Sequence, residues 1–439
     1  MSNILFDTDS YKVSMQEQYA PDVEYIQSYG GPRKGGESIF FGLQDILYST
    51  FRENIYTNAS LVRAKRIWEA HGEPFPMDAF QEASDICNVG LPLRIWSVDE
   101  GTVLQEGEPA YVVENVGGRD TRVFVPWAET SLLRVWYPSS VATTSWRIRS
   151  LIKSYLEKSG DVGGLAFKLH DFGSRGASSS ESAAIGGMAH LATGAMGTDT
   201  GVALIRAMDS YSADLPGFSI PAAEHSTITS WGKDREVDAY RNMIKQFGKP
   251  GAIVAVVSDS YNIYTAVEEM WCRELKEEVI ASGATIVIRP DSGDPLTVLP
   301  ELVRIVAASY GYTVNDKGYK ILNNIRFIWG DGINELTIGS ILRQMVDMLG
   351  YSADNFAFGM GGALLQKVDR DTYGWAQKAC AVSNGFEWRD VFKDPVTDPG
   401  KVSRKGNQRT ENMKLRYDCG TMYNIDSFSK IQQRILSVT

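Results

Sequence analysis

The sequence has 439 residues, 43% of them hydrophobic and 22% charged, which is typical of a globular protein rather than a disordered or fibrous one. Its formal net charge of −10 argues against broad binding to nucleic acid or to an anionic membrane surface. No run approaches the ~18 apolar residues of a membrane span, and Asp7 and Asp9 stand where a signal peptide would be basic. We therefore expect a cytoplasmic protein without a nucleic-acid or membrane partner.

The four cysteines are widely spaced and form no CxxC pair; they are Cys87, Cys272, Cys380 and Cys419. This spacing favours reduced thiols over a disulfide framework or a zinc site.

Residues 1–150 predict an α+β lobe of ordinary domain size. Short runs over 91–96 and 101–113, separated by Gly, Glu and Pro, indicate antiparallel strands. Flanking helices are expected over 43–52, 78–88 and 129–156.

From about Ala166 a different pattern begins, because short apolar runs end in Gly, Asp, Arg or His and helical segments usually follow them. These runs cover 166–173, 217–225, 252–259, 285–291, 325–331 and 355–362. Continuous apolar strands are typical of a parallel sheet buried on both faces. Apolar residues at helical spacing over 264–281, 299–308 and 336–349 support alternation with helices. The pattern predicts a (β/α) barrel over 151–384, with its site at the carboxyl ends of the strands.

The remaining segment, 385–439, is polar and poor in strand signals. We expect it to return to the N-terminal lobe.

The strand ends supply groups suited to a sugar phosphate and a flat heterocycle. Phe172 could stack on a ring, and Arg175 could form a fork with a phosphate, or be a structural arginine in a tight turn. Asp199 could accept a hydrogen bond from an amide, or form an Asx turn. Arg289 with Asp291 could hold phosphate and ribose, or pair with each other.

Two further strand ends carry Asp331 and a glycine cluster. Asp331 could bind a sugar diol or lie in a turn. Gly361 and Gly362 belong to a glycine-rich run whose backbone N–H groups could form a phosphate nest, and phosphate sites recur at late strand ends of barrels.

His225 follows Glu224 at the end of a short apolar run, and it is one of four histidines. An imidazole titrates near neutral pH and can accept a phosphoryl group, so acid/base catalyst, metal ligand and nucleophile are all possible roles. No other histidine stands at a metal-ligand spacing, which weakens the second role. A resident metal site is not expected, although Mg²⁺ carried by a substrate diphosphate fits these residues.

In their order along the chain, these motifs resemble the nicotinamide phosphoribosyltransferases, which are type II phosphoribosyltransferases. The matching segments are 7–12, 168–176, 197–199, 221–229, 231–234, 257–261, 288–293, 330–332, 364–367 and 391–395. Such a set in register is specific, although each motif alone is ordinary.

The resemblance implies transfer of a phosphoribosyl group from phosphoribosyl pyrophosphate to nicotinamide, enhanced by ATP through a transient phosphohistidine at His225. It implies a homodimer with shared sites. By this resemblance, Phe172 and the partner's Tyr11 would stack on the nicotinamide ring, and Asp199 would accept the carboxamide N–H. The diphosphate would be bound by Arg175, Arg289 and His225, with Asp259 orienting His225. The ribose would be bound by Asp291, Gly330 and Asp331, and the nucleotide phosphate by Gly361, Gly362 and Arg370. The chain departs from the family pattern at Ser174, at Ala363 and around Arg33.

Two alternatives remain at this stage. The first is the sister reaction on nicotinate, against which Asp199 argues because a carboxylate repels a carboxylate. The second is a non-catalytic nucleotide-binding protein on the same scaffold.

Overall fold

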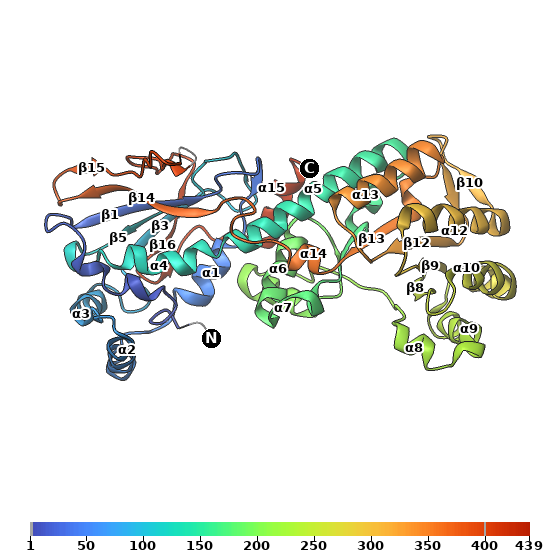
Figure 1. Ribbon diagram of the computed structural model, residues 1–439, viewed down its shortest axis with the longest axis horizontal. Coiled ribbons are helices and arrows are strands. Elements are labelled where there is room, and N and C mark those ends of the chain that lie inside the picture. The colour runs from blue at the N-terminus through green and yellow to red at the C-terminus, as the bar shows by residue number, and fades with distance from the viewer. Residues whose placement is uncertain (1–2, 399–400) are drawn as a thin grey trace. The chain divides into compact units, whose positions relative to one another are not determined.

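A computed structural model describes residues 3–398 and 401–439 (Figure 1). The chain divides into two compact units. Unit 1 comprises the residues through Thr143, then Arg206–Asp214 and Val368–Val438; unit 2 comprises Thr144–Ile205, Leu215–Lys367 and Thr439. No helix among the described residues is long and apolar enough to cross a membrane.

Unit 1 is built on a seven-stranded antiparallel sheet with the order β15-β14-β1-β5-β3-β16-β17. Its strands are β1 (Tyr25–Gly31), β3 (Leu93–Ser97), β5 (Tyr111–Asn115), β14 (Ala376–Ser383), β15 (Trp388–Asp390), β16 (Lys414–Asp418) and β17 (Thr421–Met422). In β3, buried Leu93 and Ile95 alternate with exposed Arg94, the pattern of a sheet with one covered face. Figure 1 shows the orange and red C-terminal strands beside the blue N-terminal ones. A small ribbon pairs β2 (Ser38–Ile39) with β4 (Val103–Leu104).

Helices cover this sheet and supply an aromatic core. They are α1 (Leu43–Thr50), α2 (Asn58–His71), α3 (Met77–Ile86), α4 (Phe124–Leu133) and α15 (Phe428–Leu436), with 3₁₀ turns η1 (Ser10–Lys12), η2 (Met15–Glu17) and η3 (Arg119–Thr121). Helix α4 packs on β1, β5 and β14. Its Trp127 is fully buried and packs edge-on against Phe80 with ring centroids 5.2 Å apart.

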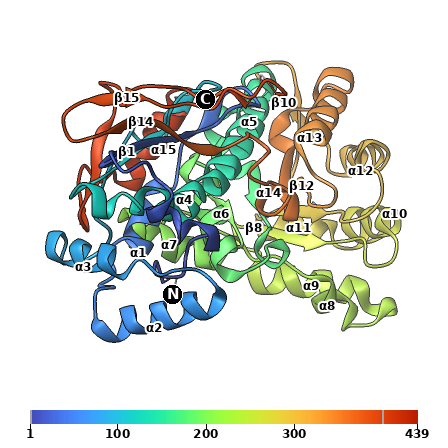
Figure 2. The same ribbon diagram turned by 60° about the vertical axis from the view of Figure 1, so that its left-hand side comes forward.

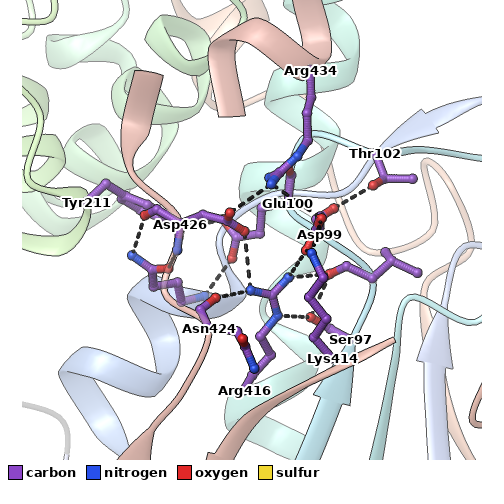
Figure 3. A network of polar contacts seen from close by, with 12 residues as sticks. Ser97, Asp99, Glu100, Thr102, Tyr211, Lys414, Arg416, Asn424, Asp426 and Arg434 are labelled. Carbon is purple, nitrogen blue, oxygen red and sulfur yellow. Dashed lines mark hydrogen bonds and ion pairs between the residues drawn. The ribbon is translucent and has the colours of Figure 1, made fainter. Parts of the chain in front are cut away.

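A network of charges, which we call the tail network, ties the C-terminal segment into unit 1 (Figure 3). Arg416 of β16 is paired with Asp99 at 2.5 Å and with Asp426 at 3.3 Å. Arg434 of α15 donates to Asp426 at 2.9 Å, and Lys414 lies 2.7 Å from Asp99. These ion pairs are connected to one another, so removing one member leaves buried charge behind.

Beside the tail network, Glu100 is buried at the start of α1. Its carboxylate accepts backbone N–H groups of Gly42 at 3.1 Å and Gln44 at 2.6 Å, and the Tyr211 hydroxyl at 2.8 Å. Burial raises the pKa of Glu100, and these hydrogen bonds oppose that rise.

The expectation of four reduced cysteines is wrong for one pair. Cys87 and Cys419 form a disulfide with their Cα atoms 5.2 Å apart, whereas Cys272 and Cys380 are free and buried. The partners are 332 residues apart in sequence and meet only because β16 pairs with β3. Spacing along the chain therefore carried no signal of this pairing.

Unit 2 contains the predicted barrel, in which parallel strands follow the order β7-β6-β13-β12-β9-β8. The strands are β6 (Leu169–Asp171), β7 (Gly197–Thr198), β8 (Ile253–Val257), β9 (Thr285–Arg289), β12 (Ile325–Trp329) and β13 (Phe356–Met360). Phe218 bridges to Gly197, and Ala222 bridges to Ala255 of β8. The segment 218–222 thus connects both edges of the curled sheet. The prediction of an irregular (β/α) barrel with an α+β lobe is confirmed.

Helices alternate with these strands; α9 packs on β8 and α12 on β12 (Figure 2). The α-helices are α5 (Trp136–Ser159), α6 (Ser180–Ala192), α7 (Gly201–Tyr211), α8 (His225–Thr229), α9 (Glu236–Phe247), α10 (Ile263–Thr265), α11 (Lys276–Ser282), α12 (Pro295–Tyr310), α13 (Glu335–Leu342) and α14 (Gly362–Leu365). The first residues of α5 and the last of α7 belong to unit 1.

The rest of unit 2 consists of shorter elements. They are the 3₁₀ turns η4 (Val162–Phe167), η5 (Ser174–Gly176), η6 (Lys233–Arg235) and η9 (Ala353–Asn355), the π-helical segments η7 (Ala266–Glu274) and η8 (Arg343–Met348), and a hairpin of β10 (Tyr312–Val314) with β11 (Lys320–Leu322). The single helix expected over 264–281 is therefore α10, η7 and α11 in succession.

Candidate active site

The carboxyl ends of the barrel strands bring most of the sequence-predicted site residues to one edge of unit 2. Asp199 follows β7, Phe172 follows β6, and Gly361 with Gly362 follows β13. Because parallel strands end at the same edge, these groups converge with those after β12, β9 and β8. Gly330 and Asp331 follow β12, Arg289 is the last residue of β9 and is followed by Asp291, and Asp259 follows β8.

His225 is the first residue of α8, and a carboxylate holds its ring. Glu224 caps this helix by accepting the Ser226 N–H at 2.9 Å. The Nε2 atom of His225 lies 3.1 Å from Oδ1 of Asp259, whose side chain is only 5% exposed. The imidazole is 40% exposed, so it is both oriented and reachable.

Asp259 also connects β8 to the loop after β9. Its Oδ2 accepts the backbone N–H of Asp291 at 3.1 Å and the hydroxyl of Ser292. One carboxylate therefore fixes both the histidine and the position of Asp291.

Arg289 offers an unused donor at this edge. Its Nη2 lies 3.9 Å from Asp291, whereas its buried Nε has no hydrogen-bond partner among the described residues. A buried guanidinium N–H without an acceptor is costly, and an anionic ligand would supply the acceptor.

The ring of Phe172 lies directly against glycine backbone. A Cβ added to Gly359 would lie 1.9 Å from the ring, and one added to Gly330 would lie 3.6 Å from it and 3.3 Å from Asp291. The ring also joins a small apolar cluster inside the barrel, formed by Ala255, Val287, Ile328, Ile220 and Ala357. The absence of side chains at Gly359 and Gly330 therefore leaves room for the Phe172 ring, which also packs on the apolar cluster.

Arg175 is exposed on η5. Hydrogen bonds from Ser226 lower the pKa of Glu224, and the charges of His225 and Arg175 act in the same direction. Arg175 therefore lies within electrostatic range of the Glu224–His225 segment. Asp331 is exposed beyond β12, and its main-chain oxygen accepts the Trp329 indole N–H at 2.7 Å.

The Asp199 carboxylate is exposed and accepts the Ser219 hydroxyl at 2.7 Å. Sequence reasoning missed Ser219, because a hydroxyl in the bridging segment carries no motif of its own. It also gave no role to Asp171, the last residue of β6, whose carboxylate accepts the Gly173 N–H at 2.7 Å and the Thr198 hydroxyl at 3.1 Å. The available signal was its place at the end of an apolar run.

Two predicted residues, Tyr11 and Arg370, belong to unit 1. Tyr11 is 62% exposed, and Arg370 pairs with Asp371 at 3.2 Å. In the described ranges, no group of three or more His, Cys, Asp or Glu side chains could hold a metal ion.

Comparison with known proteins identifies the family of the chain. Residues 167–423 match the nicotinate phosphoribosyltransferase (NAPRTase) family, and residues 3–95 match the N-terminal domain of nicotinamide phosphoribosyltransferase. A curated relative from Xanthomonas campestris pv. campestris, named nicotinamide phosphoribosyltransferase, is 50% identical over 92% of this chain and 87% of its own length. The chain belongs to the nicotinamide phosphoribosyltransferase family. Another member of this family, from Acinetobacter baylyi, is 30% identical over 93% of this chain and 88% of its own.

Solved structures support the fold of the family. A nicotinate-nucleotide pyrophosphorylase from Pyrococcus furiosus superposes with a TM-score of 0.60 at 14% identity, covering all of this chain and 96% of the other. Human nicotinic acid phosphoribosyltransferase gives a TM-score of 0.57 at 14% identity, covering 98% of this chain and 93% of the other.

Proposed function

We propose that this protein transfers the phosphoribosyl group of phosphoribosyl pyrophosphate to the ring nitrogen of nicotinamide in NAD salvage, giving nicotinamide mononucleotide and pyrophosphate. The observation that carries the proposal is the run of contacts from His225 through Asp259 to Asp291, which continues past Gly330 to the Phe172 ring. It sets an imidazole, an unpaired arginine N–H and a supported flat ring along one strand edge.

In the proposed reaction, nicotinamide stacks on Phe172 and donates its carboxamide N–H to Asp199. The pyridine nitrogen then forms a bond to the anomeric carbon of the ribose while the bond from that carbon to the diphosphate oxygen breaks. The departing electron pair goes to pyrophosphate, whose charge Arg175 and Arg289 neutralise. A general base is unnecessary because the pyridine nitrogen carries a free lone pair.

The remaining strand ends are proposed to hold the nucleotide. Asp291, Gly330 and Asp331 would bind the ribose, and Gly361 with Gly362 would receive the nucleotide phosphate through backbone N–H groups. Mg²⁺ would enter with the diphosphate and offset its charge, since the described residues offer no metal-binding cluster of their own.

ATP enhancement through a phosphohistidine is the second element of the proposal. With Nε2–H donated to Asp259, the lone pair of His225 resides on Nδ1. This nitrogen would bond to the γ-phosphorus of ATP while the bond to the ADP oxygen breaks. Water would later cleave the phosphorus–nitrogen bond and release phosphate. Asp259 would stabilise the positive imidazole in between.

Nicotinamide is proposed over nicotinate because of the charge at Asp199. The neutral carboxamide can donate to this carboxylate, whereas nicotinate would meet it with a like charge. We also propose a cytoplasmic homodimer, in which exposed Tyr11 stacks on the nicotinamide of the partner's site and Arg370 reaches its nucleotide phosphate.

One assay tests the reaction, the choice of nicotinamide and the ATP enhancement together: pyrophosphate release with nicotinamide or nicotinate, each with and without ATP. Release with nicotinamide, increased by ATP, is the expected result. Release with nicotinate but not with nicotinamide would favour the sister reaction. Binding of nicotinamide mononucleotide without any pyrophosphate release would favour a non-catalytic protein.

A further inference from the structure

Asp171 is the last residue of β6, is fully buried, and has both carboxylate oxygens occupied. Its Oδ1 accepts the backbone N–H of Gly173 at 2.7 Å, and its Oδ2 accepts the hydroxyl of Thr198 at 3.1 Å. Helix α6 passes close by at Gly187, where an added Cβ would lie 3.0 Å from Oδ2. A buried carboxylate is tolerated only where hydrogen bonds replace water, so these bonds hold two strand ends to one side chain.

The first of these strand ends carries Asp199, and Asp171 holds its backbone through two hydrogen bonds, one direct and one through Thr198. The Asp199 N–H donates to the main-chain oxygen of Asp171 at 2.9 Å. The next N–H, that of Thr200, donates at 3.0 Å to the same Thr198 hydroxyl that bonds the Asp171 carboxylate. The backbone that presents the Asp199 carboxylate is therefore tied twice to Asp171.

The second strand end carries Phe172. Its own N–H donates to Met360 at 3.0 Å, and the following N–H, that of Gly173, is the one held by Asp171. A Cβ added to Gly173 would lie 2.5 Å from Leu365 and 3.0 Å from the Gly361 oxygen. The turn after Phe172 is therefore packed closely on Leu365 and Gly361, and its hydrogen bond to Asp171 holds the backbone that follows the ring.

We propose that Asp171 is a positioning residue for the nicotinamide pocket, which sets the place of Asp199 relative to Phe172 and so determines how tightly a planar carboxamide is held. This inference rests on the proposed function. In this role Asp171 does not touch the substrate. It acts through the two residues that do, and the diphosphate-binding groups after β8 and β9 are not bonded to it.

The first test replaces Asp171 with its isostere in the full-length protein. Asp171→Asn keeps the volume but removes the charge. Its NH₂ either faces the Gly173 N–H or donates to the Thr198 hydroxyl, which already accepts the Thr200 N–H and then loses its own acceptor. We expect KM for nicotinamide to rise about 10- to 100-fold, as for loss of a buried charged hydrogen bond. KM for phosphoribosyl pyrophosphate should stay within about twofold. Asp161→Asn is the matched control, because Asp161 accepts the Gly163 N–H at 2.8 Å in the same i+2 geometry on an exposed turn.

A second pair of variants keeps the test decisive if Asp171→Asn does not fold. Thr198→Val removes the hydroxyl that relays Asp171 to the Thr200 N–H, and it should raise KM for nicotinamide; Thr198→Ser restores the hydroxyl and should restore KM. A purely structural role would lower thermal stability in these variants and leave KM for nicotinamide unchanged, which would overturn the inference. If the wild type forms no nicotinamide mononucleotide, the proposed function and this inference fall together. If the wild type is active and only the selective rise in KM is missing, the inference alone falls.

Discussion

The close approach of Phe172 to Gly359 gives a sharp prediction for Gly359→Ala. The new Cβ would lie 1.9 Å from one ring carbon and 2.2 Å from the next, where nonbonded carbons prefer about 3.5–4.0 Å. The ring must therefore move away from this backbone by about 1.5–2 Å. Overpacking of this kind costs about 1–3 kcal/mol, or roughly 2–12 °C in Tm for a unit of this size.

The effect on activity should exceed the effect on stability. A displacement of about 1 Å in a substrate-orienting group can reduce the rate about 100-fold, so kcat/KM for nicotinamide should fall by that order. The assay is nicotinamide mononucleotide formation, alongside thermal unfolding. Gly164→Ala is the control, because its added Cβ meets only the Lys168 chain, at 3.7 Å. Adding Phe172→Leu to Gly359→Ala should recover Tm without recovering kcat/KM. Wild-type activity and stability in Gly359→Ala would refute the packing of Phe172 on this backbone.

Three further predictions concern single side chains. His225→Ala should abolish the increase in rate that ATP produces and lower the basal rate; an unchanged response to ATP would contradict a phosphohistidine. Asp199→Ser should bring kcat/KM for nicotinate closer to that for nicotinamide, because the like charge is gone. A preference for nicotinamide equal to that of the wild type would contradict the proposed contact between Asp199 and the carboxamide. Burial alone would raise the pKa of Asp99, but Lys414 and the neighbouring arginines hold it below its ordinary value. A depressed pKa stabilises the folded state above the unfolded value of about 3.9, and this stability is lost as pH falls through the folded pKa. The urea midpoint of unfolding should decline below about pH 4 in the wild type and less steeply in Asp99→Asn. Equal declines in the two proteins would contradict a stabilising contribution from the Asp99 carboxylate.

The barrel could be predicted because the runs that contain its longer strands are largely apolar and end in Asp or Gly. Val254 and Val256 of β8 are fully buried on one face, and Ala255 packs inside the barrel on the other. Strand β7 could not be found in this way, since it has two residues and is defined by its pairing with β6 and its bridge to Phe218.

Other parts of the molecule depend on partners that are distant in sequence. β16 is polar on one side, and it becomes a strand because β3 offers it an edge. Ser219 and Asp171 take their roles from hydrogen bonds across the barrel edge rather than from any spacing. The Cys87–Cys419 disulfide belongs to the same class, because no local pattern encodes a contact over 332 residues.

The strand order of unit 1 has a consequence for synthesis of the protein. β1 and β3 both pair with the early strand β5, but their other neighbours, β14 and β16, are made only near the end of translation. At about 5–20 residues per second, the second edge of β1 waits on the order of tens of seconds for β14. The strands of the barrel, in contrast, are all made between Leu169 and Met360. Unit 2 can therefore complete its sheet on the ribosome while β1 and β3 of unit 1, paired only with β5, each still have one open edge. Those open edges are where the nascent chain can pair wrongly.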